Sequence, residues 1–181
     1  MIRFILSLQV FLASFFVSYA QSDFIITSKG DTLLGELRSS NDNWVKFKGK
    51  EQSKFQKLPS IEVKEVYSSF DDAHYAYKVV KLGNSPIRLA RLRKGKINLY
   101  ERRTYTYTQY GSSTNVNWYA EKDGHELVEI KTNSFWGSRE ARKNAFSQLI
   151  ADQPTILEIF NKEEKFSFKF LDKLIEQYNA L

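Results

Sequence analysis

The residues best suited to chemistry are two histidines with acidic neighbours. His74 follows Asp71 and Asp72, and His125 precedes Glu126. A zinc hydrolase helix needs a second histidine four residues after the first, and neither histidine has one. The chain also contains no cysteine, so a structural zinc site would need other ligands. The pattern favours two histidines beside turns, and we expect neither a bound metal nor a cofactor.

Paired carboxylates are the groups that glycan hydrolases use. Asp71 and Asp72 are adjacent in a predicted loop, whereas Glu62 and Glu65 point to opposite sides of a short predicted strand. Neither pair is placed by its spacing across one shared bond. Ser112 also lacks the Gly-x-Ser-x-Gly pattern of a serine nucleophile. An envelope glycan or peptide hydrolase that uses carboxylates is therefore the alternative hypothesis, and no catalytic residue is predicted.

Arginine and tyrosine side chains are concentrated between residues 88 and 110. Alternation along a strand would place Arg103, Tyr105 and Tyr107 on one face and the intervening threonines on the other. Tyrosine rings can stack on sugars and arginines can pair with anionic groups. Rows of tyrosine and threonine also stabilise exposed sheets without any ligand. The candidate ligand-binding residues are Arg91, Arg93, Arg103, Tyr105, Tyr107 and Trp118.

Short segments with strand-like alternation occupy the chain from Asp23 to Thr132 and are separated by turn residues. Hairpin turns are predicted at Lys29-Gly30, Lys94-Gly95 and Asp123-Gly124. A polar loop is predicted from Gly111 to Asn117. The predicted strands are 23–28, 32–38, 44–48, 54–58, 61–67, 75–82, 87–93, 96–108, 117–120 and 126–132.

The apolar spacing becomes helical in the last third of the chain. From Ser138 to Asp152 the apolar residues fall on one stripe. Pro154 is suited to open a second helix, and Ser167 is suited to cap a third. Strands followed by helices predict an α+β domain. We expect an antiparallel sheet or partly open barrel of about eight to ten strands, followed by two to three C-terminal helices.

Residues 1–20 have the composition of a secretory signal peptide. Arg3 precedes a mostly apolar stretch from Phe4 to Val17, and Ser18 and Ala20 are small residues at the cleavage positions. The stretch is interrupted by Gln9 and is shorter than a typical membrane span, so cleavage is favoured over a permanent anchor. We expect residues 21–181 to form one domain without a transmembrane segment, β-rich to residue 132 and helical from residue 133. The domain would lie in the periplasm or outside the cell.

The charge and the cysteine content narrow the range of partners. The chain carries a formal net charge of +6 at pH 7, a modest excess that suits anionic envelope glycans or lipid headgroups and also suits solubility alone. An envelope glycan or another envelope protein is the expected partner. Nucleic acid is not an expected partner outside the cytoplasm. Without cysteine the chain can form no disulfide and offers no thiol for lipidation.

Two stretches of the chain have a distinctive pattern. The first is Phe24-Ile25-Ile26-Thr27 followed by Gly30-Asp31-Thr32 and Gly35. The second is the tail, with Arg142-Lys143, Phe146, Asp152, Pro154 and Tyr178-Asn179. Both stretches resemble a group of secreted, β-rich proteins of the Bacteroidota that have no established activity. A cysteine commonly stands between the Asp and the Pro in that group, where this chain has Gln153. The resemblance implies an envelope or secreted β-rich domain and supplies no site.

These patterns together predict an exported, non-catalytic binding or interaction module of the bacterial envelope. Its ligand would be an anionic glycan or a protein partner. An exposed face at Arg103, Tyr105 and Tyr107 would favour binding, whereas a deep pocket that joins a histidine to carboxylates would favour the hydrolase.

Overall fold

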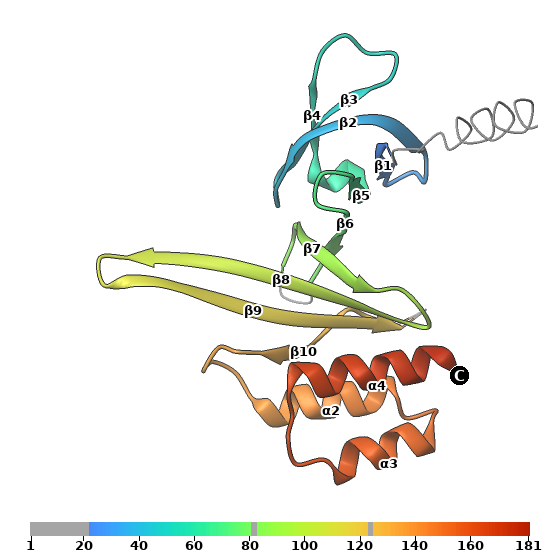
Figure 1. Ribbon diagram of the computed structural model, residues 1–181, viewed down its shortest axis with the longest axis vertical. Helices are drawn as coiled ribbons and strands as arrows, with labels where there is room; N and C mark the ends of the chain where they lie inside the picture. Colours follow the sequence, from blue (N-terminus) through green and yellow to red (C-terminus); the bar gives the residue numbers. More distant parts are fainter. Residues whose placement is uncertain (1–21, 81–82, 123–124) are drawn as a thin grey trace, which may run out of the picture.

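The computed structural model describes residues 22–80, 83–122 and 125–181. Within these residues one open antiparallel sheet has the strand order β10-β9-β8-β7-β6-β5-β1-β2-β3-β4, and three helices gather at its β10 end (Figure 1). The predicted α+β class is confirmed. The strands are β1 (Asp23–Thr27), β2 (Thr32–Ser40), β3 (Trp44–Gly49), β4 (Gln56–Pro59), β5 (Val63–Ser68), β6 (Ala73–Val79), β7 (Pro86–Arg93), β8 (Ile97–Thr108), β9 (Gly111–Lys122) and β10 (Val128–Thr132). The helices are η1 (Ser60–Glu62), α2 (Arg139–Leu149), α3 (Pro154–Lys162) and α4 (Phe168–Ala180).

Two of the predicted hairpin turns are confirmed. Lys29-Gly30 joins β1 to β2, and Gly30 has a φ of 95°, which side chains other than glycine rarely allow. Lys94-Gly95 joins β7 to β8. The third predicted turn, Asp123-Gly124, lies outside the described residues.

The prediction of a polar loop from Gly111 to Asn117 is wrong. These residues form the first part of β9, which pairs with β8 in continuous register from Thr108↔Gly111 to Ile97↔Lys122. The φ of 135° at Gly111 allows the chain to reverse direction tightly after Thr108. The segment escapes a pattern search because a ribbon exposed on both faces needs no alternation of polar and apolar residues.

The largest hydrophobic core lies between the helices and the β8–β10 part of the sheet. Phe146 of α2, Phe160 of α3 and Leu174 of α4 are almost fully buried there. The helix starts are the predicted ones: the Ser138 side chain accepts a hydrogen bond from the Ala141 amide, and Ser167 accepts one from Phe170. A separate core is enclosed by the β1–β6 part, with Ile25, Val45, Phe47, Val63, Val66 and Tyr77.

The tail residues that carry the resemblance hold the helices to the sheet. The Tyr178 hydroxyl donates to Asp152, with an O–O distance of 2.8 Å, and Asp152 pairs with Lys122 of β9 at 2.7 Å. The Asn179 side chain accepts from the Ile97 amide and donates to its carbonyl. A Cβ at Gly95 would stand 2.4 Å from the Asn179 side chain, so the turn before β8 needs a glycine for close packing. These residues are therefore explained by packing of the fold.

No helix within the described ranges combines the length and the hydropathy needed to cross a membrane.

Candidate functional site

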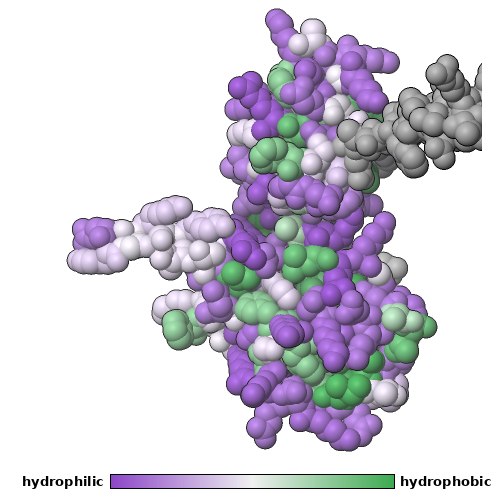
Figure 2. Space-filling model, viewed as in Figure 1, coloured by the Kyte–Doolittle hydropathy of each residue, from purple (hydrophilic) through white to green (hydrophobic). Residues whose placement is uncertain are grey.

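The outer half of the β8–β9 hairpin projects from the body of the molecule as an arm (Figures 1 and 2). We define the arm as residues 104–115. β7 pairs with β8 only as far as Ala90↔Glu101, and β10 pairs with β9 only as far as Thr132↔Asn117. The arm is thus a two-stranded ribbon beyond its neighbouring strands. Each of its residues is exposed to solvent.

The arm has an unusual composition for this chain. Charged residues make up 27% of the whole sequence, yet none occurs between Thr104 and Asn115. The arm consists of Tyr, Thr, Ser, Asn, Gln and Gly, and its three tyrosines are Tyr105, Tyr107 and Tyr110. They are 59%, 80% and 90% exposed. A ribbon in water is not expected to present large aromatic rings without charges unless another surface covers them.

The two faces of the arm differ as the sequence predicts. The continuous register places Arg103, Tyr105 and Tyr107 on one face, opposite Val116, Thr114 and Ser112 of β9. Thr104, Thr106 and Thr108 occupy the other face. The predicted sharing of one exposed face by Arg103 and the two tyrosines is confirmed, and their role in binding remains a prediction.

A second group of exposed aromatic rings lies beside the base of the arm. Phe135 and Trp136 follow β10 and are almost wholly exposed. Asn133 fixes the start of this loop to β9, because its side chain accepts from the Val116 amide and donates to the Thr114 carbonyl, at 2.7 and 2.9 Å. The arm and this loop together present five exposed aromatic rings: Tyr105, Tyr107, Tyr110, Phe135 and Trp136.

The arginines proposed as ligand-binding residues already have carboxylate partners. Arg103 pairs with Glu101, and burial would raise the pKa of Glu101, but hydrogen bonds from Arg103 and Trp118 hold it below its ordinary value. The other two candidate arginines are also paired, Arg91 with Glu65 and Arg93 with Asp172. Arg102, which is not one of the candidates, pairs with Asp42. Neutralised guanidinium groups attract an anionic polymer less strongly than free ones.

A hollow of about 310 Å³ lies where β7 separates from β8, at the base of the arm. The Asp42 carboxylate bridges this separation, since it accepts from the Arg88 amide and from the Arg102 guanidinium, each at 2.8 Å. Arg88 lies over the Tyr75 ring, with its central carbon 4.4 Å from the ring centroid. The hollow is lined by Tyr75, Arg88, Ala90, Glu101, Arg102, Arg103 and Tyr105.

Only part of the predicted site is brought together. Arg103 and Tyr105 line the hollow, and Tyr107 continues outward along the same face. Arg91 is directed to the opposite face, beside Tyr100, and Arg93 joins β7 to α4. The Trp118 side chain is 8% exposed and packs edge-on against Phe168, so its place in an exposed ligand face is corrected to a place in the core.

The polar residues that line the hollow from other strands, Tyr75 and Arg88, were not among the predicted site residues. Tyr75 of β6 and Arg88 of β7 reach the hollow because Tyr75 is opposite Ala90 in the sheet register. Their distance from Tyr105 along the chain gives no signal of this proximity. Arg88 and Arg102 belong to the same basic stretch of the sequence as Arg91 and Arg93. Their spacing alone does not show that the first two line the hollow and the last two do not.

The histidine and carboxylates considered for hydrolysis, His74, Asp72 and Glu65, make structural contacts with neighbouring side chains. The His74 ring lies against the rings of Phe24 and Tyr67, and burial followed by the charge of Arg91 lowers its pKa. Asp72 accepts a hydrogen bond from Tyr67, and Glu65 pairs with Arg91. Among the described residues no group of three or more His, Cys, Asp or Glu side chains is arranged to hold a metal ion.

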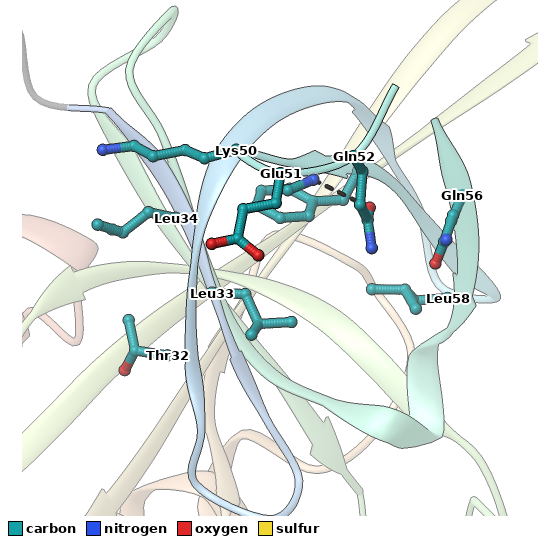
Figure 3. A pocket seen from close by; sticks show the side chains of 10 residues that line it. Thr32, Leu33, Leu34, Lys50, Glu51, Gln52, Gln56 and Leu58 are labelled. Atoms are coloured by element: carbon teal, nitrogen blue, oxygen red, sulfur yellow. Dashed lines mark hydrogen bonds between the residues drawn. The ribbon is translucent and has the colours of Figure 1, made fainter. Parts of the chain in front are cut away.

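A larger cleft of about 440 Å³ lies in the β2–β4 region (Figure 3). Leu33 and Leu58 face it from β2 and β4, and the Gln52 side chain accepts from the Gly49 amide. Its charged lining residues are Lys50 and Glu51. This lining contains neither a histidine nor a pair of carboxylates, so it provides no acid and base for hydrolysis.

No protein-family model, curated protein or solved structure matches the chain. The function therefore has to be inferred from the surface of the molecule.

Proposed function

We propose that the protein is an exported, non-catalytic interaction module of the bacterial envelope whose arm binds a protein partner. The observation that carries the proposal is the arm itself: an uncharged, wholly exposed ribbon with three outward tyrosines. The signal-like residues 1–20 and the resemblance to secreted Bacteroidota proteins support the envelope as its place of action.

The composition of the arm favours a protein partner. Binding surfaces of antibody loops are rich in Tyr, Ser, Gly and Asn, because tyrosine supplies a large rigid contact area and the small polar residues adapt their hydrogen bonds. The arm is built from the same residue types with threonine in addition. Phe135 and Trp136 beside its base extend the aromatic surface, and aromatic residues are enriched in the centres of protein interfaces.

The ion pairs weaken the case for an anionic glycan. Three arginines line the hollow, but Arg102 and Arg103 are paired with carboxylates. Burial would raise the pKa of Asp71, but hydrogen bonds from Ser68 and Tyr75 lower it, and the charge of nearby Arg88 adds to this lowering. The local positive charge is thus largely offset. Stacking on Tyr105 and Tyr107 would still be open to a sugar, so the experiment below separates the two kinds of ligand.

A shortened-arm variant tests the proposal. Residues 104–115 are replaced by Asn-Gly, a two-residue hairpin turn, and the variant is compared with the wild type by size-exclusion chromatography of envelope extracts. We expect the wild type to elute in an assembly larger than the free chain and the shortened variant to elute as the free chain, with the same circular dichroism in the helical region.

Two outcomes would contradict the proposal. If the shortened variant stays in the larger assembly, the arm is not the interaction element. If added wild-type chain forms the larger assembly with protease-treated extract as with untreated extract, but not in buffer alone, the ligand is not a protein, and a glycan is the better candidate.

A further inference from the structure

The geometry points to a second copy of this chain as the partner that covers the arm. The inference rests on the proposed function and names its partner. In the arrangement we infer, the free edge of β8 pairs antiparallel with the free edge of β8 in the other copy, and each arm tip enters the hollow at the base of the other arm.

The outer edge of β8 is open along the arm. β7 separates from it after Glu101, so residues 102–108 have β9 as a neighbour on one side and no strand of the described chain on the other. Natural proteins protect such edges with charges, prolines or bulges. The Thr104–Thr108 segment has no charge and no proline, and its pairing with β9 has no bulge. A two-stranded ribbon is also only marginally stable in water, and further strands stabilise it.

The sequence of this edge is a palindrome. Thr104-Tyr105-Thr106-Tyr107-Thr108 reads the same in both directions, so antiparallel pairing of two copies about a two-fold axis at its centre places residues of the same type opposite each other. With the axis at Thr106, Tyr105 of one copy stands opposite Tyr107 of the other, and threonines stand opposite threonines. Aromatic and Thr–Thr cross-strand pairs are favourable.

The absence of charged residues in the arm allows two positively charged copies of the chain to approach each other there. The net positive charge, +6 for the full chain and one less without Arg3, would oppose most contacts between copies. The paired segment, residues 104–108 of each copy, contains no charge, so no like charges stand opposite each other within it. Beyond it, the turn residues Gln109 and Tyr110 of one copy run toward Arg103 and Arg102 of the other. The arm therefore offers an uncharged strand edge that can meet its own copy without opposing charges.

The hollow fits the tip that this register delivers to it. Tyr110 is 90% exposed in the turn at the end of the arm, and in the inferred pairing this turn extends beyond the paired strands toward Arg102 of the other copy, one of the residues that line the hollow. The Arg88 guanidinium donates through Nη1 to the Ser40 carbonyl and hydroxyl. Its remaining N–H groups are suited to a tyrosine hydroxyl or a glutamine carbonyl.

The expected association is weak and depends on concentration. Edge-to-edge pairing covers the sides of the Tyr105 and Tyr107 rings but leaves their outer faces in solvent, so the buried area falls below the range of about 1,200–2,000 Å² that is typical of stable interfaces. The dimer is therefore expected to dissociate on dilution.

Two lysine substitutions at the same position along the arm, one on each strand, test the inference. Sedimentation velocity measures the monomer–dimer equilibrium of each variant from dilute to concentrated solution. Thr106→Lys places two lysines opposite each other at the two-fold axis, about 5 Å apart. Ser113→Lys is the matched control, because Ser113 is the cross-strand neighbour of Thr106 on β9. In the inferred dimer the two control lysines are three strand spacings apart, about 14 Å, beyond the screening length of about 8 Å at physiological salt.

We expect the wild type and Ser113→Lys to dimerise as concentration rises and Thr106→Lys to remain a monomer. The inference is overturned if the wild type stays monomeric throughout, if Thr106→Lys dimerises as readily as the wild type, or if both lysine variants lose the dimer equally. If the purified wild type stays monomeric but still enters the larger assembly in envelope extracts, only the identification of the partner as a second copy is overturned. If the wild type neither dimerises nor enters a larger assembly, the proposed function is contradicted as well.

Discussion

At the scale of single residues, the same side-chain types have different roles because of where the register places them. Tyr105 and Tyr107 are exposed on a ribbon, whereas Tyr100, on the opposite face of the same strand, is 3% exposed and donates to Glu121. Burial, followed by that hydrogen bond, raises the pKa of Tyr100 above its ordinary value. Exposure therefore separates the tyrosines available to a partner from those that hold the fold.

This difference predicts that substitution of a buried aromatic residue lowers the stability strongly, whereas substitution of the exposed arm tyrosines hardly changes it. Trp118→Ala should lower the free energy of unfolding by about 3–5 kcal/mol, because it empties a buried site against Phe168. The double variant Tyr105→Ala, Tyr107→Ala should change it by less than about 0.5 kcal/mol. Urea denaturation followed by circular dichroism measures both. A large loss of stability in the double variant would show that the arm tyrosines are part of the fold.

The ion pair between β7 and α4 predicts a dependence of stability on pH. The hydrogen bond from Arg93 lowers the pKa of Asp172. Its stabilisation is therefore complete above the ordinary aspartate pKa of about 3.9 and is lost as the pH falls through the lower pKa of the folded state. Asp172→Asn should cost about 1 kcal/mol at neutral pH, after allowance for partial exposure, and nothing at strongly acid pH.

Glu176→Gln is the matched control for this prediction. Glu176 contacts the same arginine at 3.0 Å, but its side chain is 60% exposed. Its effect should stay below about 0.5 kcal/mol at every pH. An Asp172→Asn deficit that persists unchanged in acid would mean that the carboxylate charge is not what stabilises this contact.

At the scale of elements, alternation and capping identified most strands and all three long helices of the described chain. They succeeded where one face is buried, as for Val45 and Phe47 on β3 or Leu171 and Leu174 on α4. They failed at Gly111 to Asn117, where both faces of the ribbon are exposed and no period is imposed. The site was only partly predictable for a related reason, since β6 and β7 contribute Tyr75 and Arg88 through sheet register.

The packing of α4 on the sheet makes a further prediction. Leu174 is 1% exposed in the main core, so Leu174→Ala should reduce the free energy of unfolding by about 2–5 kcal/mol. Ile159→Ala on α3 is the control, because Ile159 is 41% exposed and should cost about 1 kcal/mol or less. Equal losses in denaturant titrations would contradict the assignment of α4 to the core.

At the scale of the whole molecule, we expect export to leave a chain that starts at Gln21. The reasons are Arg3, the apolar stretch to Val17 and the small residues Ser18 and Ala20. Mass spectrometry of the chain from the envelope fraction should find Gln21 as the N-terminal residue. An intact Met1 terminus there would contradict cleavage.

The central claim, that the arm is the interaction element, is tested most directly by site-specific photocrosslinking in intact cells. A photoreactive amino acid replaces Tyr107 on the arm, or, as a control, Ile61 on η1, which is also an exposed large side chain. The proposed function predicts a discrete protein adduct from position 107 and none from position 61, and an adduct of twice the chain mass would identify a second copy. Absence of an adduct at position 107, or equal adducts at both positions, would contradict the claim.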